Sequence, residues 1–168
     1  MKSIIISIRP DRIEKIFAGE ATIEIRKTAP REFMDLEPHY QFSRNKDIDV
    51  YIYCTNIGKP FVEKPFAKMP INGSVVAKFK LSEIKKIVLN EEEKFVYSNS
   101  IGNPLVDANI EYDELCDYLG YYGFSGQHKN LFFAYAWTIK DLDVFAKPKN
   151  LYEFGLNKTV HSWQRMEM

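Results

Sequence analysis

The sequence has few cysteines and no long apolar run, and each shortage excludes a class of protein. Its two cysteines, Cys54 and Cys116, form neither the disulfide framework of a small secreted protein nor a zinc-ligand spacing. We predict that both are buried thiols. No segment approaches the roughly 20 apolar residues of a membrane span, and the apolar run near residue 1 is too short for a signal peptide. We therefore expect a cytoplasmic protein.

The sequence also lacks net charge, because Lys+Arg and Asp+Glu both number 23. The chain therefore lacks the overall positive charge typical of nucleic-acid-binding proteins, and any binding to nucleic acid must depend on local charge. Local charge does vary: residues 1–31 hold seven basic and four acidic groups, whereas residues 107–117 hold five acidic groups and no basic one. A basic surface and an acidic surface are both expected.

Several catalytic and binding motifs are missing as well. The chain has no nucleotide-binding glycine loop, no serine nucleophile elbow, no zinc-ligand set and no dinucleotide fingerprint. His39 stands alone, without a partner at ligand spacing. We therefore predict no cofactor and no metal.

The residues that are present predict one packed domain over residues 1–168. Hydrophobic residues make up 45% of the chain and aromatic residues 14%, which is ample for a core. Residues 3–8 (SIIISI) have the continuous hydrophobicity of a strand buried on both faces. After them, Pro10 begins a short helical pattern, and Gly19 stands where a C-terminal cap belongs.

From Thr22 to Arg26 polar and apolar residues alternate, which predicts a strand. Ile23 and Ile25 then face a core, while Thr22, Glu24 and Arg26 share the opposite face. If exposed, the carboxylate and guanidinium form a surface ion pair worth at most about 1 kcal/mol. If partly buried, Glu24 can act as an acid or base or bind a base edge, while Arg26 binds an oxyanion or phosphate.

Later segments complete the predicted secondary structure. Alternation predicts strands at 48–55 and 75–81, the second of which either ends there or runs into a further strand up to residue 89. It also predicts a strand at 131–140, and a closing strand is expected at 161–166. Helical spacing predicts a helix at 111–119 and a short capped turn at 151–155, and Pro148 is expected to end a segment. Loops are predicted over 28–45, 56–73, 90–105 and 120–126. The first mixes basic and aromatic residues, a combination that can bind nucleic acid but is more typical of an ordinary loop whose aromatic residues pack against the edge of the core.

The run SIRPDRIEKIFAGEATIEIRKTAP resembles the signature of the ASCH domains, a group within the PUA-like superfamily of small β-barrels. Their pattern is a strand, a helix and then G-x-K-x-x-E-x-R, which Gly19, Glu24 and Arg26 match. Further similarity lies in YIYCT, GSVVAKFKL, FAYAWTI followed by Lys147-Pro148, and the closing HSW. The resemblance thus follows most of the chain in order.

This resemblance implies a cleft that is lined by the motif and binds RNA or a nucleotide-like ligand. Some ASCH proteins are similar to hydrolases: one bacterial branch deacetylates N4-acetylcytidine with a Lys, a Thr and a Glu, and others are reported to cleave RNA. In this chain the Lys position is Ala21 and the Thr position is Glu24. Without an amine to activate a hydroxyl, the resemblance does not support that amidohydrolase mechanism here.

We predict an α+β fold, a small PUA-like barrel of five to seven mostly antiparallel strands with two or three helices, that binds RNA or a nucleotide-like ligand. One alternative is an RNA or modified-nucleoside hydrolase with Glu24 as general base. Another is a protein-interaction module that uses the acidic helix around Asp113. The predicted ligand-binding residues are Ser7, Arg9, Thr22, Glu24, Arg26, Lys27, Thr55, Tyr135, Ser162 and Trp163.

Overall fold

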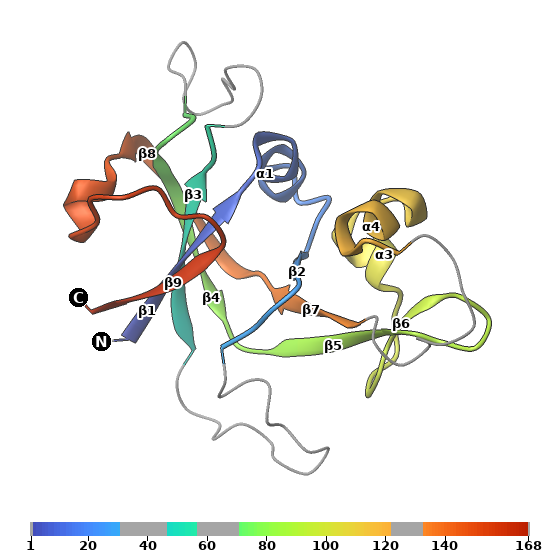
Figure 1. The fold of residues 1–168 in the computed structure, drawn as a ribbon. Coiled ribbons are helices and arrows are strands. Elements are labelled where there is room, and N and C mark those ends of the chain that lie inside the picture. Colours follow the sequence, from blue (N-terminus) through green and yellow to red (C-terminus); the bar gives the residue numbers. More distant parts are fainter. Residues whose placement is uncertain (1, 31–46, 57–70, 122–132, 168) are drawn as a thin grey trace. The chain divides into compact units, whose positions relative to one another are not determined.

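The computed structural model describes residues 2–30, 47–56, 71–121 and 133–167, and these form an α+β protein (Figure 1). The chain divides into two compact units. Unit one comprises Met1–Gly19, Asp47–Ser82 and Ile139–Met168, and unit two comprises Glu20–Lys46 and Glu83–Thr138. Most of the predicted loops at 28–45, 56–73 and 120–126 lies outside the described residues.

Unit one is built on a five-stranded sheet in the order β8-β4-β3-β1-β9. Its strands are β1 (Lys2–Ile8), β3 (Ile48–Cys54), β4 (Val75–Leu81), β8 (Lys140–Lys149) and β9 (Trp163–Glu167). Strand β1 runs parallel to β3, and the other pairs are antiparallel. The prediction of a doubly buried first strand is confirmed, because Ile4, Ile5, Ile6 and Ile8 are each at most 2% exposed.

Two short helical segments occur among the described residues of unit one. Helix α1 (Pro10–Phe17) begins with proline at its first turn, where a missing N–H costs nothing, and buries Ile13 and Ile16. Gly19, just beyond its C-cap, adopts φ +72°, the left-handed conformation that favours glycine. The 3₁₀-helix η1 (Leu151–Phe154) packs against a cluster that includes Ile5 and Met166. Both predicted segments are confirmed.

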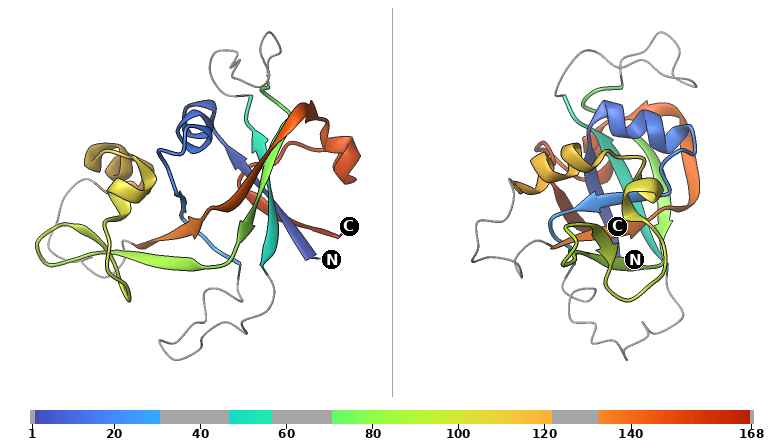
Figure 2. Two further views of the ribbon diagram at one scale, coloured as in Figure 1. Left: turned by 180° about the vertical axis from the view of Figure 1, so that it is seen from behind. Right: turned by 90° about the vertical axis from the view of Figure 1, so that its right-hand side faces the viewer.

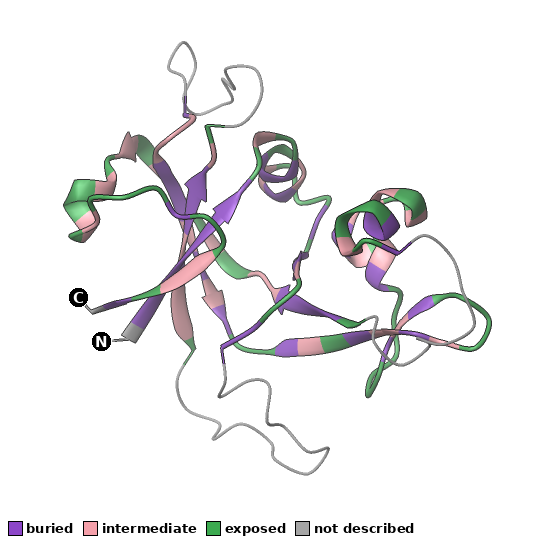
Figure 3. Cartoon of the chain, viewed as in Figure 1, coloured by how far each residue is buried: buried purple, intermediate pink, exposed green. Residues whose placement is uncertain are grey.

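Unit two carries a four-stranded antiparallel sheet in the order β2-β7-β5-β6. In the described part of unit two the strands are β2 (Ile23–Arg26), β5 (Ile84–Leu89), β6 (Phe95–Tyr97) and β7 (Phe133–Thr138), and the helices are α3 (Pro104–Ala108) and α4 (Tyr112–Leu119) (Figures 1 and 2). One core cluster joins Ile23 and Ile25 of β2 to Ala134 and Ala136 of β7 and to Leu115 of α4. Figure 3 shows this burial along the ribbon.

The predicted architecture needs three corrections. The described residues hold nine strands rather than five to seven, and they form two open sheets rather than one closed barrel. The stretch 90–105 contains β6 and the start of α3, which Asn103 caps by accepting a hydrogen bond from the Leu105 N–H. Pro148 does not end a segment but lies inside β8, an edge strand, where proline removes no required hydrogen bond.

Several tyrosines of unit two make its stability sensitive to alkali. Burial, reinforced by a 2.7 Å hydrogen bond from the Tyr97 hydroxyl to Asp107, raises the pKa of Tyr97, and burial raises the pKa of Tyr112 to about 12. Tyrosine in an unfolded chain titrates near pH 10. Above that pH the unfolded chain loses protons that the folded chain keeps, so the free energy of unfolding falls as pH rises.

For Tyr112 this loss runs from about pH 10 to about pH 12. We expect the urea midpoint to be steady up to about pH 9 and to fall at pH 10 and above, and Tyr97→Phe to make the fall shallower. Urea unfolding followed by circular dichroism, with absorbance at 295 nm to report phenolate, measures both effects. A midpoint that stays constant to pH 11.5 contradicts this prediction.

Candidate functional site

The polar face of β2 carries a buried ion pair. Along this strand Ile23 and Ile25 enter the core of unit two, so Glu24 and Arg26 project from the opposite face. The Glu24 carboxylate lies 3.6 Å from a terminal guanidinium nitrogen of Arg26. Their side chains are only 7% and 11% exposed, respectively. The predicted sharing of one strand face by Thr22, Glu24 and Arg26 is confirmed for Glu24 and Arg26, whereas Thr22 lies before the first residue of β2 and bonds to α3.

This burial decides between the two interpretations of the pair. An exposed pair is worth little, but two charges removed from water lose hydration that their attraction repays only in part. Glu24 and Arg26 are therefore not an ordinary surface pair. Charges held out of water also interact more strongly with any polar group that reaches them, which is the property a recognition site needs.

Aromatic side chains of β7 share this face. In the β2–β7 pair, Glu24 lies opposite Trp137 and Arg26 lies opposite Tyr135, and directly opposed residues project to the same side of a sheet. Trp137 is fully buried and Tyr135 is 8% exposed. Burial raises the pKa of Tyr135, which keeps its phenol neutral at ordinary pH.

The face continues onto β5. Tyr135 lies opposite Lys86, and the ring of Phe133 meets that of Tyr135 edge to face, with centroids 5.8 Å apart. The Lys86 ammonium nitrogen lies 4.8 Å from the centre of the Phe133 ring. We call the charged and aromatic side chains on this side of β2, β5 and β7 the Arg26 face; they are Glu24, Arg26, Lys86, Phe133, Tyr135 and Trp137.

Two of the predicted residues in unit two make their contacts with the helices instead. The Thr22 N–H and hydroxyl both donate to the carbonyl oxygen of Asp107 in α3, at 2.8 and 3.3 Å. The Lys27 ammonium lies 5.2 Å from the ring centre of Tyr118 in α4. Thr22 thus anchors the chain just before β2, and Lys27 covers an aromatic ring.

The remaining predicted residues belong to unit one. The Ser7 N–H and hydroxyl both donate to the carbonyl oxygen of Ser162, at 2.7 and 3.0 Å, which holds the segment before β9 against β1. Arg9 is exposed and forms a 3.2 Å ion pair with Asp11. Thr55 and Trp163, two further predicted site residues, have backbone partners. The Thr55 N–H donates to the Ile8 carbonyl, and Trp163 lies opposite Ile6 in the β1–β9 pair.

Sequence reasoning missed Lys86, Phe133 and Trp137 as members of the site. Alternation along β7 does place Phe133, Tyr135 and Trp137 on one face, so the two additional aromatics could have been found from it. Lys86 had no such signal. Its place depends on the register between β5 and β7, which no local pattern encodes.

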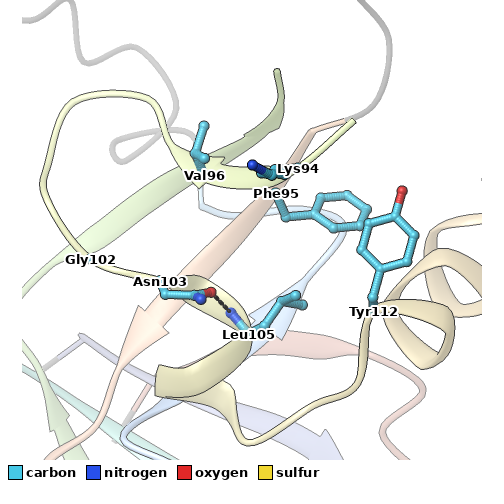
Figure 4. Close-up of a pocket in the computed structure, with 7 residues that line it drawn as sticks. All are labelled: Lys94, Phe95, Val96, Gly102, Asn103, Leu105 and Tyr112. Atoms are coloured by element: carbon cyan, nitrogen blue, oxygen red, sulfur yellow. Dashed lines mark hydrogen bonds between the residues drawn. The ribbon is translucent and has the colours of Figure 1, made fainter. Parts of the chain in front are cut away.

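A separate cavity of about 210 Å³ lies elsewhere in unit two (Figure 4). Its wall is mostly apolar, and its polar side chains are already engaged: Asn103 caps α3, and Lys94 pairs with Glu92 at 2.7 Å. Its lining residues are Lys94, Phe95, Val96, Gly102, Asn103, Leu105 and Tyr112. The chemistry of the Arg26 face is therefore richer than that of this cavity.

The described residues offer neither a reactive thiol nor a metal-binding cluster. Both cysteines are buried and free, as predicted, and burial raises the pKa of Cys54 to about 12, so its thiol is a weak nucleophile. No cluster of three or more His, Cys, Asp or Glu side chains able to hold a metal ion occurs there. None of the helices in these residues is long and apolar enough to cross a membrane.

No protein-family model and no curated protein sequence matches the chain. Solved structures do. The crystal structure of ASCH from Zymomonas mobilis superposes with a TM-score of 0.60 at 18% identity, covering 98% of this chain and 87% of that one. A tyrosine-to-phenylalanine mutant of the Zymomonas mobilis protein gives 0.58 at 18% identity, covering 99% and 91%. The backbone is shared over nearly the whole length, and this chain therefore has the fold of an ASCH domain.

Proposed function

We propose that this protein binds RNA or a nucleotide-like ligand through the Arg26 face. The observation that carries the proposal is the buried pair of Glu24 and Arg26 beside aromatic rings. A guanidinium offers a planar set of donors that matches a phosphate or a base carbonyl. A carboxylate accepts hydrogen bonds from the amino groups of a base. Together with a stacking ring, these groups supply the three interactions with which proteins recognise unpaired nucleotides.

The experiment uses conservative variants, because truncating one partner of a buried pair would disturb the fold. Arg26→Lys keeps the charge but loses the planar fork, and Glu24→Gln keeps the shape but loses the charge. We expect each to weaken binding about tenfold or more, the usual scale for a lost charge-assisted hydrogen bond. Fluorescence polarisation with labelled single-stranded and hairpin RNAs measures the change, and a nucleoside panel is titrated by calorimetry.

Lys78→Ala is the matched control, since Lys78 is a cation of unit one that pairs with Asp143 at 3.7 Å. Its affinity should equal that of the wild type. Binding should also fall as salt rises, because phosphate contacts release counterions. The proposal is wrong if the wild type associates with no member of the panel, or if Arg26→Lys and Glu24→Gln bind as tightly as Lys78→Ala does.

A second candidate is a hydrolase of RNA or a modified nucleoside with Glu24 as general base. It is favoured by a carboxylate held in place beside a guanidinium that can stabilise an oxyanion. The amine expected from the amidohydrolase branch is not supplied, because its position is Ala21, which is 3% exposed. Mass spectrometry of the same RNA panel after incubation tests this function. Product that forms equally with Glu24→Gln removes Glu24 from the mechanism.

A further inference from the structure

We infer that the Arg26 face takes single-stranded RNA of two or more nucleotides, with Phe133 and Lys86 forming a second nucleotide subsite beside that of Arg26 and Tyr135. The inference rests on the proposed function and specifies its ligand. It comes from a gradient of burial and from the placement of two cations, both within unit two.

The aromatic residues of β7 form a row on this face. Trp137, Tyr135 and Phe133 occur at every second position, and their exposed fractions rise from 0% through 8% to 39%. The row is thus buried at Trp137 and exposed to solvent at Phe133, and we call the Phe133 end the open end. Phe133 is an aromatic residue that is 39% exposed at the end of its strand, so solvent reaches it and a flat partner such as a nucleobase can approach it.

Lys86 supplies a cation at the same open end. It is exposed, and its ammonium nitrogen lies 4.8 Å from the centre of the Phe133 ring. The cation–π contact therefore presents a ring and a positive charge together. A base that stacks on Phe133 would place its own phosphate within reach of Lys86, because the ammonium is a flexible point charge on a long stem.

The two cations, Arg26 and Lys86, are carried by strands on either side of β7. Arg26, Tyr135 and Lys86 lie opposite one another across β2, β7 and β5. Adjacent strands are about 4.8 Å apart, so the backbones that carry Arg26 and Lys86 are separated by about 10 Å. Cations carried by separate strands of the sheet can each contact a different phosphate of one single-stranded RNA. The paired strands of a duplex would keep their bases stacked on each other and unavailable to Phe133.

The test compares RNA length against variants of the open end. Wild-type protein is titrated with uridine monophosphate and with single-stranded oligouridylates of two, four and six nucleotides, followed by polarisation and, for the monophosphate, by NMR. We expect affinity to rise from one nucleotide to two or more. Phe133→Leu, which keeps an apolar side chain but loses the flat ring, and Lys86→Ala should each lower the affinity for the longer RNAs about tenfold. Each should lower the affinity for the monophosphate by less than it lowers the affinity for the longer RNAs, because a single nucleotide can occupy the Arg26 subsite alone.

Lys85→Ala is the control. Lys85 neighbours Lys86 on β5 and also lies over an aromatic ring, at 5.0 Å from the centre of Tyr97, but it projects to the helix side of the sheet. Its affinity for every RNA should match the wild type. Lys86→Ala should also lower the salt dependence, the slope of log affinity against log salt, by about 0.7, the value for one phosphate contact of a single strand. Lys85→Ala should leave that slope unchanged.

The outcomes separate this inference from the proposed function. If monophosphate and hexanucleotide bind equally well, or if both open-end variants bind the longer RNAs as the wild type does, the second subsite is wrong while binding at Arg26 stands. If no RNA or nucleotide binds the wild type, both fail. Length-dependent affinity lost in Phe133→Leu and Lys86→Ala, but not in Lys85→Ala, supports the subsite.

Discussion

Replacing Arg26 with methionine should lower the free energy of unfolding by about 3–5 kcal/mol. The reason is the burial of Glu24, whose side chain is 7% exposed and would lose the opposite charge of the guanidinium 3.6 Å away. Removing one member of a buried ion pair destabilises a protein because the remaining group keeps its cost of burial and loses the attraction that offset it. Urea unfolding followed by circular dichroism at pH 7 measures the loss.

The double variant Glu24→Leu/Arg26→Met supplies the control for this prediction. Removing both charges together avoids burying the carboxylate without the guanidinium, so the double variant should be more stable than Arg26→Met alone by at least about 2 kcal/mol. It should fold and yet fail to bind the RNA panel. The single variants Glu24→Leu and Arg26→Met are measured beside it. If their losses of unfolding free energy add up to the loss in the double variant, Glu24 and Arg26 act independently, against the 3.6 Å pairing.

Trp137→Ala should cost a similar amount, about 3–5 kcal/mol, through a different mechanism. Trp137 is 0% exposed and lies between Glu24 of β2 and Ile84 of β5 in the sheet of unit two. Removing the indole opens a cavity that the neighbouring strands cannot fill without leaving their register. Because the substitution also removes a fluorophore, unfolding is best followed by circular dichroism.

Tyr152→Ala is the matched control for Trp137→Ala. Tyr152 is also aromatic but is 78% exposed on η1, so its truncation should change the free energy of unfolding by no more than about 0.5 kcal/mol. Trp137→Phe should fall between the two, since it leaves a smaller void. A loss in Trp137→Ala no larger than in Tyr152→Ala would contradict the burial of the indole.

Local signals in the sequence predict the centre of the site well. Proline at the start of α1, Gly19 after its end and the alternation of β2 are each encoded within a few residues, and the structure confirms all three. These signals are local because a helix cap depends on residues within the last turn and strand alternation depends on residues two positions apart. They suffice to place Glu24 and Arg26 on one face.

These local patterns could not predict burial or strand register, which depend on residues far apart in the sequence. Whether Glu24 and Arg26 are buried depends on what packs over them, and the partnership of Arg26, Tyr135 and Lys86 depends on strand register. Strand β8 escaped prediction because an edge strand with many exposed residues shows little alternation of hydrophobicity, and Pro148 suggested an end. Strand β6 and helix α3, of three and five residues, are too short to show a period.

The pairing of β1 with β9 has a consequence for synthesis on the ribosome. Lys2 lies opposite Glu167, so the sheet of unit one is completed by strands at opposite ends of its sequence. The described strands and helices of unit two all lie within residues 20–138, so they are synthesised before β9. Until β9 emerges, β1 has one open, strongly apolar edge that can pair with other nascent chains. Folding of the two units is thus expected to be ordered in time, with chaperone dependence concentrated on unit one.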